Sequence, residues 1–191
     1  MPTPDAFFHF RILVGIVTGL SISRLLTGLA RPVQYPGVKR LGLTQPAWAI
    51  FMLVMIVHFW WFELGLSKIG KWTFGLYLFV IGYAVLIFLI STILFPDQMD
   101  QFPDPDEYFF SRRGWFYGLL IALFIVDIGD TALKGEAHFR AVGPEYLVLQ
   151  FTLVGLSLVG IFLKRRLYDA AFVSVGILLQ VVWALRLFDS G

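Results

Sequence analysis

Two aspartates lie inside an otherwise apolar segment in the second half of the chain. Asp127, Asp130 and Thr131 are spaced so that a helix would place all three on one face. Carboxylates within a long apolar segment are costly to bury, so they indicate either a functional site or a buried ion pair. When such acids meet a histidine they form the usual parts of a proton relay, because imidazole titrates near physiological pH.

Two other apolar segments carry polar residues at similar depths. His58 precedes Glu63 in one of them, and Gln180 precedes Arg186 in the other. If the three segments are parallel helices, these groups fall into two bands, one near the middle and one about a turn further out. The middle band holds His58, Asp127 and Gln180, and the outer band holds Glu63, Asp130 and Arg186.

The polar residues allow two interpretations, and the sequence favours neither. In the first, Arg186 pairs with Asp130 or Glu63. His58 then pairs with Asp127, and the closed network fixes the arrangement of the helices. In the second, water reaches a pocket that handles a small cation or a proton.

The first apolar segment carries a lone arginine and a row of small residues. Arg24 lies on the opposite half from Asp127, about 10 Å away in depth, so a lipid phosphate, a helix-end carbonyl or an anion is the expected partner. The small residues recur every four positions and would let another helix approach closely. They are Gly15, Gly19, Ser23 and Thr27. We expect them to pack within the chain, with a subunit contact as the alternative.

Several kinds of chemistry lack their residues. The chain contains no Cys and no Asn, which excludes disulfides, thiolate metal sites, iron–sulfur clusters and N-glycosylation. The motifs of nucleotide hydrolases, serine hydrolases, zinc proteases and potassium filters are absent. His58 has no second intramembrane histidine for haem ligation. We therefore expect no metal, no cofactor and no enzymatic activity, and a membrane enzyme ranks third among the functions considered.

The composition is that of an integral membrane protein. Of 191 residues, 58% are hydrophobic and 15% are charged, whereas soluble domains carry about 25% charged residues. The mean hydropathy is +0.78. A net charge of +2 is too small for nucleic-acid binding to be the main activity. The lipid bilayer is thus the first expected partner.

Charge-poor runs of about 20 residues mark the helices that cross a hydrocarbon core about 30 Å thick. They predict an all-α integral membrane protein, a single polytopic domain over residues 1–191 with six transmembrane helices. The predicted spans are 10–30, 43–66, 72–95, 114–134, 145–163 and 168–188. The first span is not typical of a signal peptide, because Asp5 precedes it and Arg24 interrupts it. The acidic connection 96–113 lacks the ligand order of a calcium loop, and its three prolines predict a solvated loop.

A weak repeat divides the chain. A Pro-x-aromatic triplet begins at Pro46 in the second span and at Pro144 in the fifth, and each following span has a central glycine, Gly82 or Gly176. The pattern predicts two three-helix halves with inverted topology, a symmetry common in transporters.

Lysines and arginines set the expected orientation, because they favour the cytoplasmic side. Eight flank the first, third and fifth connections and six lie on the other side, so we expect an inner-membrane protein with both termini outside. The eight are Arg31, Lys39, Arg40, Arg112, Arg113, Lys164, Arg165 and Arg166.

The expected function is a small homo-oligomeric channel or transporter that carries an ion or proton through the acidic and histidine cluster. The alternative is a noncatalytic membrane subunit or scaffold that packs against partner proteins.

Overall fold

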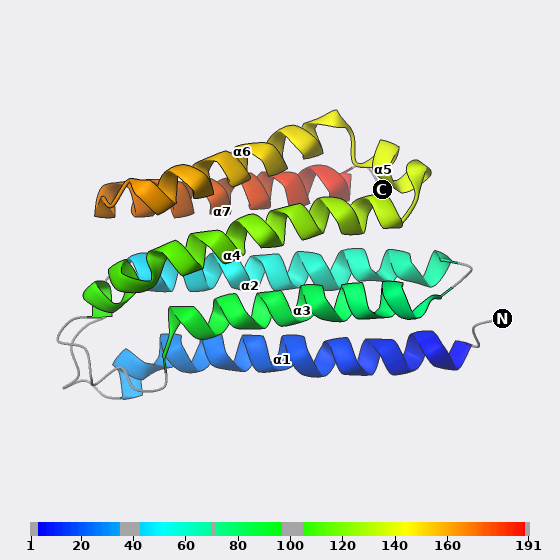
Figure 1. Cartoon of the computed structure of the whole chain (residues 1–191), viewed down its shortest axis with the longest axis horizontal. Helices are drawn as coiled ribbons and strands as arrows, with labels where there is room; N and C mark the ends of the chain where they lie inside the picture. Colours follow the sequence, from blue (N-terminus) through cyan, green and yellow to red (C-terminus); the bar gives the residue numbers. More distant parts are fainter. Residues whose placement is uncertain (1–3, 35–42, 70–71, 97–104, 190–191) are drawn as a thin grey trace.

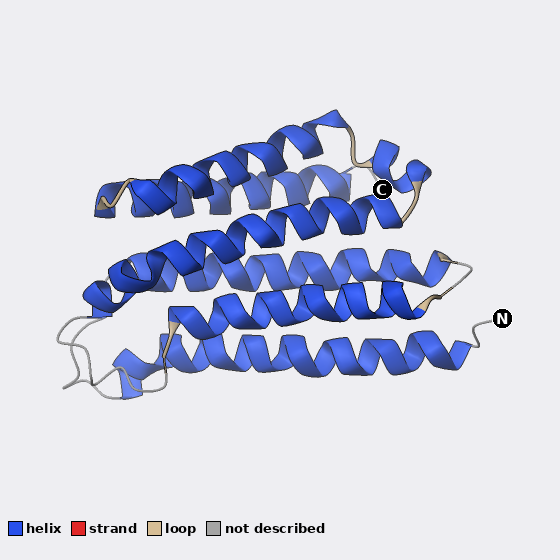
Figure 2. Ribbon diagram, viewed as in Figure 1, coloured by secondary structure: helices blue, strands red, loops and turns tan. Residues whose placement is uncertain are grey.

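The computed structural model describes residues 4–34, 43–69, 72–96 and 105–189. Within these ranges the chain forms helices and no strand (Figure 2). Six of the described helices are long and apolar enough to cross a membrane, which suggests a multi-pass membrane protein. They are α1 (Pro4–Gln34), α2 (Thr44–Glu63), α3 (Phe74–Leu94), α4 (Pro105–Leu133), α6 (Pro144–Phe162) and α7 (Arg166–Asp189).

The predicted spans correspond to these helices, but some boundaries were wrong. α1 extends beyond 10–30 at both ends. α4 begins at Pro105, well before the predicted start at 114, so the part of the connection from 105 to 113 is helical and not a loop. A proline is tolerated in the first helical turn because its missing N–H is not needed there. Residues 97–104 lie outside the described residues.

Two short elements lie at the end of the bundle that carries both termini. η1 (Leu64–Lys68) is a 3₁₀ turn that continues α2, and α5 (Glu136–Ala141) connects α4 to α6. Gly135 and Gly143 flank α5 with φ angles of 101° and 79°, a region that favours glycine. These two turns place α5 across the ends of α4 and α6 (Figure 1).

The long helices form two layers. α1, α3, α4 and α6 lie side by side in that order, and α2 and α7 lie behind them (Figure 1). α1 packs mainly against α3, whereas α4 packs mainly against α6. The first three-helix segment of the chain is therefore arranged differently from the second.

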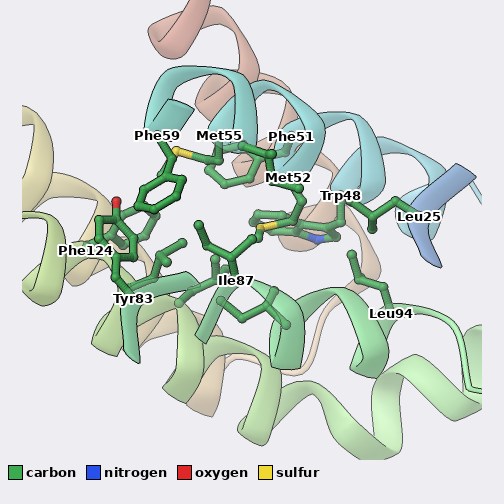
Figure 3. Packing of buried hydrophobic residues seen from close by; sticks show 14 of the residues in the cluster. Leu25, Trp48, Phe51, Met52, Met55, Phe59, Tyr83, Ile87, Leu94 and Phe124 are labelled. Atoms are coloured by element: carbon green, nitrogen blue, oxygen red, sulfur yellow. The ribbon is translucent and has the colours of Figure 1, made fainter. Parts of the chain in front are cut away.

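Aromatic rings fill the core in the half that lies away from the termini. Trp48 is fully buried, and its ring centroid lies 4.9 to 5.8 Å from those of four other rings. Figure 3 shows Trp48 beside Met52 in this core. We call the five residues the aromatic plug: Trp48, Phe51, Phe116, Tyr117 and Phe172. The plug fills the middle of this half of the bundle with rings, and Tyr117 also donates a hydrogen bond from its hydroxyl to Asp169.

Large apolar side chains are exposed on every long helix. They include Leu20, Val57, Leu78, Ile125, Phe151 and Leu178. Soluble monomers rarely expose a continuous apolar surface of this kind, because it would bind other proteins or membranes. The surface therefore matches the apolar composition of the six helices.

The row of small residues on α1 packs differently from our expectation. Only Gly15 lies against another helix, since a Cβ there would meet Cζ2 of Trp60 at 3.2 Å. Gly19, Ser23 and Thr27 are exposed, and a Cβ on Gly19 would meet no atom within 4 Å. The expectation that the row packs within the chain is thus wrong for these three residues.

α1 packs through the neighbouring face instead. Its buried residues are Phe10, Val14, Thr18, Ser21, Leu25 and Gly28. Trp60 of α2 donates a hydrogen bond from Nε1 to Oγ1 of Thr18 at 2.9 Å. A Cβ at Gly28 would collide with the ring of Phe95, so glycine is required for the close approach of α1 to the end of α3.

Candidate polar site

Asp127 is the centre of a hydrogen-bonded group that joins α3, α4 and α6. Tyr83 donates to Oδ1 at 2.7 Å, and Tyr146 and Gln150 each donate to Oδ2 at 2.6 Å. Thr131 donates to the Tyr146 hydroxyl at 2.9 Å. These contacts use three of the roughly four acceptor positions of a carboxylate and hold it in one orientation.

Lys134 forms a second polar group just outside the first. Its Nζ lies 3.1 Å from Oε1 of Glu63 and also pairs with Oδ2 of Asp130. All three side chains are buried, so water screens these ion pairs very little. The pairs connect the end of α2 to the end of α4.

The two groups together carry more negative than positive charge. Among the described residues they contain three carboxylates, Glu63, Asp127 and Asp130, and one ammonium group, that of Lys134. A buried carboxylate without a counter-charge is strongly unfavourable. The site therefore has an electrostatic reason to take up a proton or a cation.

A cavity of about 50 Å³ lies beside Asp127. Polar residues from four helices line it: His58, Asp127, Asp130, Gln150 and Gln180. His138 and Val142 place α5 and the turn after it at the wall of the cavity. Since a water molecule takes about 30 Å³ in the liquid, the cavity has room for one or two waters or a small ion.

Several buried polar atoms at the cavity wall have no hydrogen-bond partner in the described part of the chain. Gln180 is 4% exposed, and neither its Oε1 nor its Nε2 is paired. Oε1 of Gln150 and Oδ1 of Asp130 are also unpaired. Buried polar atoms nearly always have partners, so such a group indicates a bound water or ligand.

The structure brings together most of the residues that the depth bands predicted. His58, Asp127, Asp130 and Gln180 line one cavity, and Glu63 joins them through Lys134. The hydrogen bonds described for the Asp127 carboxylate come from Tyr83, Tyr146 and Gln150, so the pairing of His58 with Asp127 stays a prediction.

Arg186 does not belong to the site. It pairs with Glu145 at 3.1 Å, and both side chains are more than half exposed. The prediction that it pairs with Asp130 or Glu63 is wrong because Lys134 already occupies that position. Arg24 lies on the second half of α1, which runs away from the termini, and therefore far from the cavity.

Sequence reasoning missed four residues of the site. Lys134 had a detectable signal, because it follows Asp130 by four positions and such pairs meet on a helix. Gln150 had the same signal as Gln180, a polar side chain in a charge-free run, and was overlooked. Tyr83 and Tyr146 had none, since tyrosines are ordinary residues of apolar spans and gain their role only when α3 and α6 pack against α4.

A second buried polar group lies at the opposite end of α4. Nη2 of Arg113 donates to Oδ1 of Asp169 at 2.8 Å and to the carbonyl oxygen of Leu163 at 2.7 Å. Tyr117 donates to the same Asp169 oxygen at 2.6 Å. Sequence reasoning placed Arg113 in a loop and missed this contact, which fastens α4 to the turn between α6 and α7.

Comparison with known proteins adds no function. No protein-family model, curated protein or solved structure matches the chain. Among the described residues, no group of three His, Asp or Glu side chains is placed to hold a metal ion. The geometry of the cavity is therefore the basis for a functional proposal.

Proposed function

We propose that this protein is a multi-pass membrane protein that binds a small cation or a proton beside Asp127 and carries it across the membrane. The observation behind the proposal is the cavity lined by Asp127 and Asp130, next to the ion-paired group in which Lys134 is shared by Asp130 and Glu63. Buried acids that lack a matching cation persist in apolar surroundings when a proton or a cation compensates their charge.

The position of the cavity supports a gated transporter more than an open pore. Asp127 lies in the half of α4 near the termini, while the aromatic plug fills the other half of the bundle. A cation that enters from the end with the termini would reach Asp127 and stop there. Passage to the other side would require the helices around the plug to move.

We further propose an inner-membrane location with both termini outside. Of the described basic residues, six lie at the helix ends opposite the termini and five at the end with the termini, and positive residues favour the cytoplasm. The six are Arg31, Arg112, Arg113, Lys164, Arg165 and Arg166. Lys39, Arg40 and Lys71 lie outside the described residues. The packing does not support the predicted inverted three-helix halves, because α1 packs mainly against α3 and α4 mainly against α6, and the proposed transport does not depend on them.

Ion flux in reconstituted vesicles tests the proposed transport. Asp127→Asn removes the charge and keeps the shape of the side chain, but it replaces one accepting oxygen by an NH2 donor. The tyrosine hydroxyls and the Gln150 amide can reorient to accept from it, so we expect the variant to abolish flux and leave the fold intact. Glu136→Gln is the matched control, because Glu136 is exposed on α5 and pairs with Arg140. If wild-type vesicles show no flux of any small cation driven by pH or potential, the transport proposal is wrong.

The exposed row on α1 favours a second candidate function. Gly19, Ser23 and Thr27 offer a face on which another helix could pack closely. A noncatalytic subunit or scaffold would use this face to bind a second copy or another membrane protein. In that case Asp127 has a structural role, and Asp127→Asn destabilises the protein instead of abolishing flux. We propose no enzymatic activity.

A further inference from the structure

We propose that the cavity beside Asp127 selects the ammonium ion, or a singly methylated ammonium ion, over sodium and potassium. This inference rests on the proposed function, because it names the cation that the site would carry. Unpaired acceptors, aromatic walls and a fixed ammonium group within the same cluster support it.

The unpaired hydrogen-bonding atoms at the cavity wall are mostly acceptors. They comprise Oδ1 of Asp130, Oε1 of Gln150 and Oε1 of Gln180, with Nε2 of Gln180 as the unpaired donor. Oδ1 of Asp127 also accepts from Tyr83 alone among the described residues. Each of these side chains except Asp127 is more than nine-tenths buried. A ligand that donates several hydrogen bonds satisfies this wall, and an anion does not.

Aromatic rings form much of the remaining wall. Phe59, Phe62, Phe124 and Trp183 line the cavity together with the two tyrosines that bind Asp127. The faces of such rings attract ammonium groups. A sodium or potassium ion would take the same oxygen atoms as ligands but has no N–H groups to donate to them, so the directed hydrogen bonds and the rings are what favour ammonium.

The same cluster already holds a primary ammonium group. Nζ of Lys134 lies between Glu63 and Asp130, both of them buried. Asp130, which lines the cavity, thus offers one oxygen to the lysine, and its other oxygen is buried without a partner in the described part of the chain. The acids at this end of the bundle are therefore arranged to bind N–H donors that carry a positive charge.

The size of the cavity limits the ligand. A volume of about 50 Å³ holds one small ion or one to two waters packed closely. Ammonium is close to water in size, and methylammonium adds one methyl group that the rings can contact. Tetramethylammonium has no N–H group and exceeds the space, so we expect it to be excluded.

Binding to the purified protein in nanodiscs is the first measurement. Thermal unfolding is compared in chlorides of ammonium, methylammonium, sodium, potassium and tetramethylammonium at equal ionic strength. We expect the first two to raise the unfolding temperature and the other three to have no effect beyond that of ionic strength. Equal or greater stabilisation by sodium or potassium would overturn the ammonium inference.

Uptake of labelled methylammonium into vesicles is the second measurement. Protein-free vesicles give the leak of the neutral amine, which is subtracted. Uptake above this leak, without sodium or potassium flux, supports the inference. Sodium, potassium or proton flux without methylammonium uptake overturns it and leaves the proposed transport standing. The absence of any flux overturns both.

Gln180→Met tests the site itself, because it removes the unpaired amide without changing the charge or greatly changing the volume. We expect ammonium affinity to fall by about tenfold or more. Ser174→Ala on the same helix is the control, since Ser174 is exposed. Trp183→Leu is the second variant, used if Gln180→Met does not fold, and it should also weaken ammonium binding. Unchanged affinity in the folded variant would overturn the assignment of the cavity.

Discussion

Lys134 is the residue that allows Glu63 and Asp130 to be buried together. Its ammonium group contacts both carboxylates, and its side chain is almost completely covered. Removing one member of a buried ion pair leaves an uncompensated charge, which is worse than never having formed the pair. The stability of this end of the bundle should therefore depend strongly on one side chain.

Lys134→Met is predicted to destabilise the protein by about 3 to 5 kcal/mol, because two acids lose their counter-charge. The free energy of unfolding, measured by denaturant titration in detergent, checks the value. Arg140→Met is the control. It breaks the exposed ion pair with Glu136, and exposed pairs contribute little to stability. Equal losses in the two variants would show that Lys134 is not buried as described.

The residues of the site were only partly predictable from sequence. Apolar runs reveal an aspartate or a histidine by contrast, and this is how His58, Asp127 and Gln180 were found. Arg186 was misplaced because depth along a helix does not give rotation about its axis, and α7 turns this side chain outward to Glu145. Tyr83 could not be found, since a tyrosine gives no such contrast.

α4 is the element that connects the two buried polar groups. It carries Arg113 near one end and Asp127 with Asp130 near the other. Its middle packs closely against α6, where a Cβ on Gly160 would meet the ring of Tyr117 at 2.8 Å. Tyr117 in turn donates to Asp169, so the ring has little freedom to move away.

Gly160→Ala is predicted to destabilise the protein by about 1 to 3 kcal/mol through overpacking against Tyr117. Gly155→Ala on the same helix is the matched control, because a Cβ there meets no atom within 4 Å. The control should be neutral or slightly stabilising, since alanine favours helix more than glycine does. Thermal unfolding of both variants in detergent measures the difference. A loss in Gly155→Ala as large as that in Gly160→Ala would contradict the described packing.

The existence of each long helix was predictable, but its ends were not. Hydropathy identified α4, yet the helix extends back to Pro105 through a charged segment that includes Arg113. That extension is stabilised by the contact of Arg113 with Asp169, which lies on another helix. A prediction based on charge-free runs ends the helix before a charged residue such as Arg113, because it cannot detect an ion-pair partner that is distant in sequence.

At the scale of the whole molecule, the described termini of α1 and α7 lie at the same end of a two-layer bundle (Figure 1). The even number of spans predicted from hydropathy implies this arrangement. The order of the helices within the layers was not predictable, because hydropathy shows that a helix crosses the bilayer and not which helix it contacts. The packing of α3 against α4 is one example.

Fusions at the C-terminus test the orientation. A reporter enzyme that works only in the periplasm should be active when fused after residue 191. One that works only in the cytoplasm should be inactive there, because the basic helix ends favour the cytoplasmic side. A fusion in the connection between α6 and α7, which lies at the opposite end, should give the reverse result. If the fusion after residue 191 is active only with the cytoplasmic reporter, and the fusion between α6 and α7 only with the periplasmic one, the termini lie inside.

Gly19→Leu tests the proposed homo-oligomer. The leucine would project from the exposed face of α1, so it should leave the folded monomer stable and disrupt an oligomer that uses this face. Mass measurement in mild detergent distinguishes the two species. A wild-type protein that is monomeric, or an oligomer unaffected by the substitution, would exclude the α1 face as a subunit contact.

The lengths of α1 and α6 have a consequence for the surrounding lipid. α1 has 31 residues and α6 has 19, which gives lengths of about 46 and 28 Å at 1.5 Å per residue. They lie at opposite edges of the same layer (Figure 1). Arg11 and Arg31 are about 30 Å apart along α1, a spacing that anchors this edge at both headgroup regions. α6 is near the lower limit for crossing a bilayer. The bilayer beside α6 should therefore be thinner than the bilayer beside α1. We therefore expect transport activity to be lower in bilayers of long-chain lipids than in bilayers of short-chain lipids. In the thicker bilayer, α6 is too short to match the hydrocarbon core.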